Sequence, residues 1–125
     1  MARMCRAAEL ESTTNHRVHT ERSRLMRLWS GFLAEYPVLV GPNLATAPWA
    51  PDADLDPVAG LDLLRDATRF ILPGNALGLP CVALPMGPTN GLPTSVQIYA
   101  DLWREDLCLA AAAILEAGTP PSPRP

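Results

Sequence analysis

The spacing of apolar residues first becomes regular at Thr20. From there to Tyr36, apolar residues recur on one helix face and charged residues occupy the other faces. This pattern predicts an amphipathic helix with Thr20 as its N-cap. Residues 1–19 are polar and show no clear period, so we expect a loose N-terminal arm. Residues 119–125 are rich in proline and are expected to be disordered, which leaves residues 20–118 as the folded part.

Three segments have the pattern of strands. Residues 38–40 and 81–84 are short apolar runs without polar alternation, which is typical of strands covered on both faces. Residues 94–99 alternate between apolar and polar positions. The pair Asn90-Gly91 precedes them and indicates a turn.

Two further helices are predicted between and after these strands. Asp56-Pro57 has the pattern of an N-cap followed by proline at the first helical position, and Pro73-Gly74 is expected to end that helix. Residues 104–117 have the pattern of the last helix. The order of the elements predicts an α/β fold, with a partial mixed sheet of two to three strands and about three helices.

The apolar strands need cover on both faces, and this chain offers few elements to supply it. We therefore expect them to belong to a larger sheet, and we expect the isolated chain to aggregate, self-associate or stay molten. The core that the chain can form is predicted to contain seven apolar residues: Phe32, Leu39, Val82, Leu84, Val96, Ile98 and Leu115.

Composition narrows the classes of function. The chain has 125 residues, enough for one small domain, and 48% of them are hydrophobic, which argues against global disorder. The net charge of −3 gives no reason to expect nucleic acid or an anionic membrane as partner. The three cysteines are an odd number without CxxC spacing, which favours a reducing compartment. The N-terminus lacks the apolar segment of a secretory signal, so we expect a cytoplasmic protein, and no cofactor is indicated.

Three stretches resemble recurring elements of the amidase signature family: LWSGFLAEYPVLVGPN, FILPGNALGLPCVALPMG and NGLPTSVQIYADLWREDLCLAAAAILE. They occur in the family's order over residues 28–116, and the three together are more specific than any one of them. The resemblance implies a C-terminal fragment of the amidase signature fold. Members of this family are carbon–nitrogen hydrolases that convert linear carboxamides to carboxylate and ammonia.

The family's chemistry depends on a Ser–Ser–Lys triad, carried on a Gly/Ser-rich segment upstream of these stretches. All ten basic residues of this chain are Arg, so no Lys amine is present to act as the base. The five serines are nowhere adjacent in the sequence: Ser12, Ser23, Ser30, Ser95 and Ser122. No catalytic residue can therefore be assigned.

The missing triad leaves two hypotheses for the function. The resemblance implies a truncated or degenerate amidase that is inactive alone. The alternative is a non-catalytic interaction module that docks on a separate, triad-bearing amidase chain. The implied partner is an amidase N-terminal segment, or a second copy of this chain through self-association.

Two positions depart from the family's pattern. Ser95 stands where the family usually has glycine after Gly-Leu-Pro-x, and its side chain would crowd a close backbone approach. Thr68 stands where the tRNA-dependent amidotransferases of the family carry an acidic residue that holds the substrate amino group. The second difference favours the general amidase, or acetamidase-like, branch as the parent.

Three residues are candidates for substrate contact by analogy with the family: Trp49 in the proline-rich loop, Arg69, and Asn75 in the Pro-Gly-Asn turn. Each also has a structural interpretation. Trp49 could be a packing residue, and Arg69 could be a solvated cation at a helix end. Asn75 could hydrogen-bond the backbone of a tight turn and start a short helix.

Other polar residues are weaker candidates. Ser95 has no base near it in sequence, so a strand position is favoured over a nucleophile. His16 and His19 could form half of a metal site with Cys5 or Glu11, but no second pair of ligands follows. Solvated side chains are favoured for both histidines, and no metal site is predicted.

Overall fold

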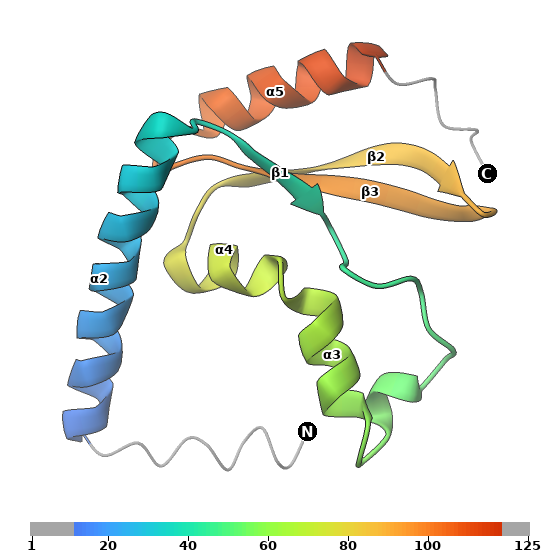
Figure 1. The fold of residues 1–125 in the computed structure, drawn as a ribbon, viewed down its shortest axis with the longest axis horizontal. Coiled ribbons are helices and arrows are strands. Elements are labelled where there is room, and N and C mark those ends of the chain that lie inside the picture. The colour runs from blue at the N-terminus through green and yellow to red at the C-terminus, as the bar shows by residue number, and fades with distance from the viewer. Residues whose placement is uncertain (1–11, 119–125) are drawn as a thin grey trace.

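The computed structural model describes residues 12–118 of the chain (Figure 1). Its elements, in chain order, are α2 (Ser12–Glu35), β1 (Leu39–Pro42), the 3-10 helix η2 (Ala53–Leu55), α3 (Gly60–Thr68), α4 (Ile71–Leu77), β2 (Cys81–Thr89), β3 (Leu92–Tyr99) and α5 (Glu105–Gly118). The α/β fold is confirmed, and the described part has four α-helices where about three were expected. Residues 1–11, which are part of the expected N-terminal arm, lie outside the described residues. The expected tail, residues 119–125, lies outside them as well.

The sheet has the strand order β1-β3-β2, so β3 is central. Tyr99 of β3 aligns with Leu39 of β1 and with Cys81 of β2, and both pairings are antiparallel. A mixed sheet was expected, and within the described residues no parallel pairing occurs. Part of the reason is the connection, because a two-residue turn joins β2 directly to β3 and strands joined in that way can only be antiparallel.

The turn at Asn90-Gly91 is confirmed, and it forms the tip of a hairpin. Both residues have positive φ, 53° and 78°, and Thr89 pairs with Leu92 across them. These are the dihedrals of a type I′ turn, which matches the twist of the two strands. Strand β2 therefore continues to Thr89, well past its predicted end at residue 84. Its two prolines, Pro85 and Pro88, are tolerated because β2 is an edge strand with a bulge between Pro85 and Gly87.

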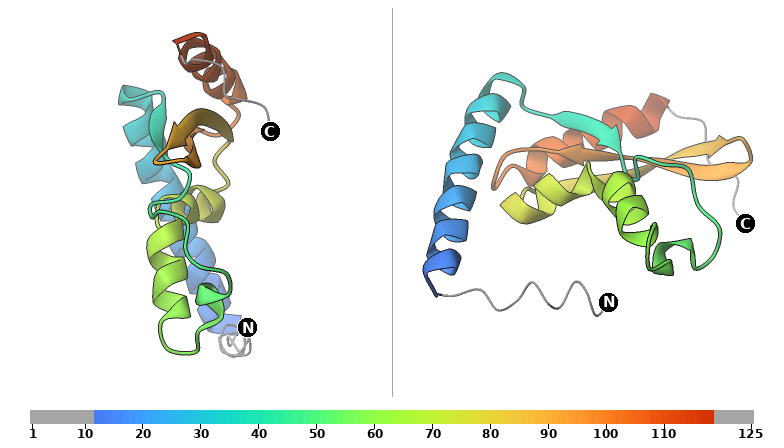
Figure 2. Two further views of the ribbon diagram at one scale, coloured as in Figure 1. Left: turned by 90° about the vertical axis from the view of Figure 1, so that its right-hand side faces the viewer. Right: turned by 60° about the horizontal axis from the view of Figure 1, so that its bottom comes forward.

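Helices cover the two faces of the sheet near the start of β2 and the end of β3. Helix α5 packs on β2 and β3 from one side, and α4 lies on the other, as the views in Figures 1 and 2 agree. Gly74 of α4 lies directly against the ring of Tyr99. Helix α2 contacts α4, and the Arg22 guanidinium donates hydrogen bonds to the Ala76 and Leu77 carbonyls at the end of α4.

The core differs from the set of apolar residues predicted for it, because only two of its nine buried members were among the seven predicted. Ile98 and Leu84 are buried as expected, whereas Leu39, Val82, Val96 and Leu115 are half-buried. Phe32 was predicted to be a core residue, but it is exposed. On α2 the neighbouring Leu33 faces the body, and Phe32 contacts Trp29 and Tyr36 along the helix surface instead. Helical spacing defined the apolar stripe but did not indicate which of its residues the rest of the chain would cover.

Helix α2 begins at Ser12, well before the predicted start. Thr20 lies inside the helix, where its hydroxyl donates a hydrogen bond to the His16 carbonyl, so Thr20 is not an N-cap. No Gly or Pro interrupts the chain from Ser12 to Ser30, and helix formation can therefore extend through this polar segment.

The predicted middle helix is two helices. Asp56 accepts hydrogen bonds from the backbone amides of Val58 and Ala59, each at 2.8 Å, and stabilises a turn, so α3 begins only at Gly60. Pro73 lies in the first turn of α4, where a missing N–H is tolerated, and does not end a helix. The stop is Gly78, which has φ 74° and donates its N–H to the Gly74 carbonyl. No helix within residues 12–118 is long and apolar enough to cross a membrane.

Candidate functional site

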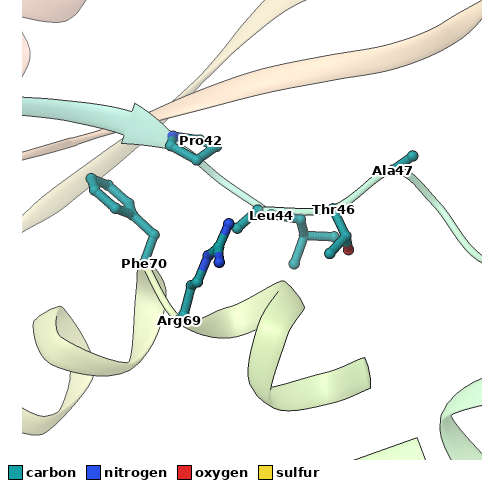
Figure 3. A pocket seen from close by; sticks show the side chains of 7 residues that line it. Pro42, Leu44, Thr46, Ala47, Arg69 and Phe70 are labelled. Atoms are coloured by element: carbon teal, nitrogen blue, oxygen red, sulfur yellow. The ribbon is translucent and has the colours of Figure 1, made fainter. Parts of the chain in front are cut away.

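A cavity of about 500 Å³ lies between the loop that follows β1 and the junction of α3 and α4. Figure 3 shows the side chains around it, with Arg69 extending from the junction toward the loop at Leu44. Seven residues line the cavity: Pro42, Leu44, Ala45, Thr46, Ala47, Arg69 and Phe70.

Backbone hydrogen bonds hold the loop in place on both sides of this cavity. The Ala45 amide donates to the Ala67 carbonyl near the end of α3, at 2.9 Å. The Asn43 amide donates to the Ser95 carbonyl of β3, at 3.3 Å. The loop is thus tied both to the helix and to the sheet, and the cavity between them has a defined shape.

Phe70 forms the inner wall of the cavity and is itself held firmly. A Cβ at Gly41 would overlap the Phe70 ring, so glycine is needed there for β1 to lie against it. The ring also contacts Tyr99, with 5.8 Å between ring centroids, and the Tyr99 hydroxyl donates to the Phe70 carbonyl at 3.4 Å. Burial raises the pKa of the Tyr99 phenol, with a smaller effect from Cys81, so Tyr99 is a neutral donor near neutral pH.

Two polar groups stand out in the otherwise apolar lining. Arg69 is exposed and carries a full positive charge. The hydroxyl oxygen of Thr46 is buried and has no hydrogen-bond partner within the described residues. Buried hydroxyl groups normally have a partner, so this atom marks a place where a water molecule or a ligand could bind.

A second hollow of about 350 Å³ adjoins the first on the other side of the loop. It lies between the loop and the β2–β3 hairpin, and its lining includes Thr89, Pro93 and Ser95. Leu44, Thr46 and Ala47 border both spaces. The loop is therefore a wall shared by two neighbouring hollows.

Of the three residues predicted to contact substrate, only Arg69 lines one of these spaces. Trp49 is half-buried in the loop, beside the lining residue Pro48 but outside both linings. Asn75 is exposed and lies inside α4. The interpretation that Asn75 sits in a tight turn and starts a short helix is therefore wrong. The structure does not bring the three side chains together at either hollow.

Thr46 and Phe70 were not predicted as lining residues. Phe70 matched the apolar pattern of a helix face, and nothing in the pattern of Thr46 distinguished it from other loop residues. The proline-rich composition of the loop was the one signal that pointed to this region.

The weaker candidates do not form a reactive group. Ser95 is half-buried on β3 and lines the second hollow. His16 and His19 lie on the exposed surface of α2, whereas Cys5 and Glu11 lie outside the described residues. Among residues 12–118, no group of three or more His, Cys, Asp or Glu side chains could hold a metal ion.

Similarity to known proteins covers most of the chain. The family model described as Amidase matches residues 2–109. An indoleacetamide hydrolase from Bradyrhizobium japonicum is 35% identical over 96 residues, which are 76% of this chain and 21% of that protein. A fatty acid amide hydrolase from Arabidopsis thaliana is 34% identical over 107 residues, which are 83% of this chain and 18% of that protein.

A third relative has a different named activity. The glutamyl-tRNA(Gln) amidotransferase of Streptococcus equi subsp. zooepidemicus (strain MGCS10565) has an A subunit that is 31% identical over 99 residues, which are 78% of this chain and 20% of that protein. The chain thus spans about a fifth of the length of the curated relatives that it matches. The family match extends over most of the sequence and includes the residues of both hollows, so the chain belongs to the amidase signature family.

Proposed function

We propose that this chain is a non-catalytic part of an amidase, related to the C-terminal portion of the family fold. In the assembled enzyme it would cover and shape the acyl side of a cleft in which a carboxamide is hydrolysed to carboxylate and ammonia. The observation that carries this proposal is chemical. The 125 residues contain neither a Lys that could act as base nor two adjacent serines, so they cannot hold the family's triad.

The exposed apolar surface supports a role within a larger assembly. Trp103 and Ile114 are exposed to 85% and 74%, and Leu61 and Leu109 to 60% and 61%. Each 100 Å² of apolar surface left in water forgoes about 2.5 kcal/mol of stabilisation. A small domain has only about 5–15 kcal/mol of stability in total, so the free energy forgone by a few hundred Å² of exposed apolar surface is a large fraction of it.

The described sheet is open at both edges, which supports the same role. β1 and β2 each pair with β3 alone among the described strands. Their outer N–H and C=O groups are available to further strands, as in a sheet that continues into another segment. The proposed partner is a triad-bearing amidase segment.

A direct assay tests whether the chain has activity of its own. The purified chain should release no ammonia above background from acetamide or benzamide, because it supplies no activated nucleophile. The Ser95→Ala variant is the control for a role of that serine. Ammonia release that scales with protein concentration would contradict the proposal, and its loss in Ser95→Ala would assign the activity to that serine.

Complementation tests the proposed partner. The indoleacetamide hydrolase of Bradyrhizobium japonicum, with its matching fifth deleted, would be co-expressed with the present chain. We expect the two to copurify and the present chain to become more soluble, because each covers apolar surface of the other. Failure to copurify, with the chain a monodisperse monomer on its own in analytical ultracentrifugation, would refute the assembly.

A second function is favoured by one feature of α2. Trp29, Phe32 and Tyr36 form a row of aromatic contacts on this helix, and Phe32 and Tyr36 are exposed. Exposed aromatic side chains in a row are typical of a protein interface. The chain could therefore be an interaction module that docks on a separate amidase. Copurification of the chain with the full-length indoleacetamide hydrolase would favour this alternative, whereas copurification only with the deleted form would favour a truncated amidase.

A further inference from the structure

We propose that the cavity between the 43–47 loop and the α3–α4 junction binds a small carboxylate, with Arg69 holding the anionic group and Thr46 donating its hydroxyl. The inference deepens the proposed function. It rests on that function only where it interprets the bound carboxylate as part of the substrate. It would make the substrates of the assembled enzyme carboxamides that carry a carboxylate elsewhere in the molecule.

Arg69 is the one arginine that lines this cavity, and its charge is free to meet a ligand. Within the described residues it makes no ion pair and no side-chain hydrogen bond. Its planar guanidinium can therefore donate two parallel hydrogen bonds to a carboxylate.

Most other arginines of the described chain are engaged elsewhere. Arg24, Arg65 and Arg104 form ion pairs with Glu21, Asp62 and Asp106. Arg22 donates to two carbonyls at the end of α4. Arg27 lies on the exposed surface of α2, and Arg17 lies on the same helix beside a separate hollow that α2 forms with the end of α4. Of these unpaired guanidinium groups, Arg69 is the one at the cavity beside the 43–47 loop.

Thr46 supplies an independent reason to expect a polar ligand. Its hydroxyl oxygen is buried without a partner within the described residues, while the residue itself lines the cavity. A change of χ1 rotamer moves the threonine hydroxyl to another staggered position, so it can turn toward a ligand. A ligand oxygen in the cavity could thus satisfy a group that the chain by itself leaves unpaired.

The rest of the lining determines the kind of carboxylate. Pro42, Leu44 and Phe70 are apolar, and the volume of about 500 Å³ lies within the range of small-molecule sites. One guanidinium matches one negative charge, which fits a monocarboxylate better than a phosphate or a polyanion. The preferred ligand is therefore a carboxylate on a short apolar body, and benzoate is a suitable probe.

The test is a titration of the full chain with benzoate and with benzamide, followed by the backbone amide signals of Thr46 and Phe70 in two-dimensional NMR. The chain would be kept soluble by a fused carrier protein. The two probes have nearly the same shape and differ in charge. We expect saturable shifts with benzoate and at least tenfold weaker binding of benzamide. Equal binding of both probes, or no saturable response to benzoate, overturns the proposal.

Three variants assign the effect to residues. Arg69→Gln should weaken benzoate binding about tenfold and make the two probes equivalent. Thr46→Val should weaken it severalfold without lowering the melting temperature, because valine is isosteric and leaves no unpaired hydroxyl. Arg65→Gln is the matched control, since Arg65 is an exposed arginine of α3 outside the cavity, and it should change nothing.

The outcome is independent of the proposed function. Unchanged benzoate binding in Arg69→Gln would overturn the carboxylate site even if the chain still copurified with an amidase segment. Conversely, charge-dependent binding that is lost in Arg69→Gln would establish the site even if complementation failed.

Discussion

Two glycine-to-alanine substitutions on helices should change stability in opposite directions. Gly31 lies on the exposed surface of α2, and a Cβ there would meet nothing within 4 Å. Gly74 is buried in α4, and a Cβ there would overlap the Tyr99 ring and lie 2.7 Å from its hydroxyl oxygen. The same chemical change therefore meets open space at one site and a packed aromatic ring at the other.

The magnitudes follow from helix propensity and packing. Alanine is favoured over glycine in a helix interior by about 1 kcal/mol, so Gly31→Ala should stabilise the fold by up to that amount. At Gly74 the same gain is opposed by overpacking, which costs about 1–3 kcal/mol when the neighbours cannot move. Tyr99 is only 3% exposed and contacts Phe70, so its ring has little room to shift. We expect Gly74→Ala to destabilise the chain by up to about 2 kcal/mol.

Thermal unfolding followed by near-ultraviolet circular dichroism measures both effects, with each variant fused to the same carrier protein so that the chain stays soluble. For a domain of this size, 1 kcal/mol corresponds to a shift in Tm of about 4–8 °C. Gly31→Ala should raise Tm, and Gly74→Ala should lower it, under identical conditions. In a Tyr99→Leu background the penalty at Gly74 should largely disappear, because the overlapping ring atoms are absent. If Gly74→Ala raises Tm as Gly31→Ala does, then α4 does not lie against the sheet as described.

Two further predictions concern titratable groups. Cys108 is buried, and burial raises the pKa of its thiol, while Cys81 is exposed. Iodoacetamide should therefore modify Cys81 many times faster than Cys108 at pH 8, as measured by peptide mass spectrometry. Equal rates at the two cysteines would contradict the packing of α5 on the sheet. The Asp56 carboxylate accepts two backbone amides, first that of Ala59 and then that of Val58, which lowers its pKa. A lowered folded-state pKa means that this stabilisation is present above the unfolded value of about 4 and is lost as the pH falls through the folded value. In NMR spectra, the amide signals of Ala59 and Val58 should shift with a midpoint below pH 4 in the parent chain and should not shift with pH in Asp56→Asn. A midpoint above pH 4 in the parent chain would refute the capping role of Asp56.

Local chemistry explains why some features were predictable. Asn90-Gly91 specified a type I′ hairpin because both residues accept positive φ, a property of the residues themselves. The last helix was predicted within one residue at each end, because its charged first turn and terminal glycine are local signals. The family resemblance and the absence of the triad were likewise visible in the order of the residues alone.

Local patterns were misleading where a distant segment decided the outcome. Pro73-Gly74 has the pattern of a helix stop, yet α4 runs through both residues, with Pro73 in its first turn and Gly74 against Tyr99. Phe32 has the spacing of a core residue, and it is exposed because the described chain places nothing over that side of α2. Pro85 and Pro88 are usual strand breakers, and they are accommodated because β2 is an edge of the sheet.

By itself the sequence determined the α/β class, the hairpin, the family and the lack of the catalytic residues. Each of these depends on residue type and order over short spans, where backbone preferences act directly. Only the tertiary structure decided that Arg69 and Thr46 line one cavity. The loop and the α3–α4 junction are brought together by two contacts, the hydrogen bond from the Ala45 amide to the Ala67 carbonyl and the packing of Phe70 on Gly41. Contacts between segments more than twenty residues apart depend on the packing of the whole chain, and no local pattern encodes them.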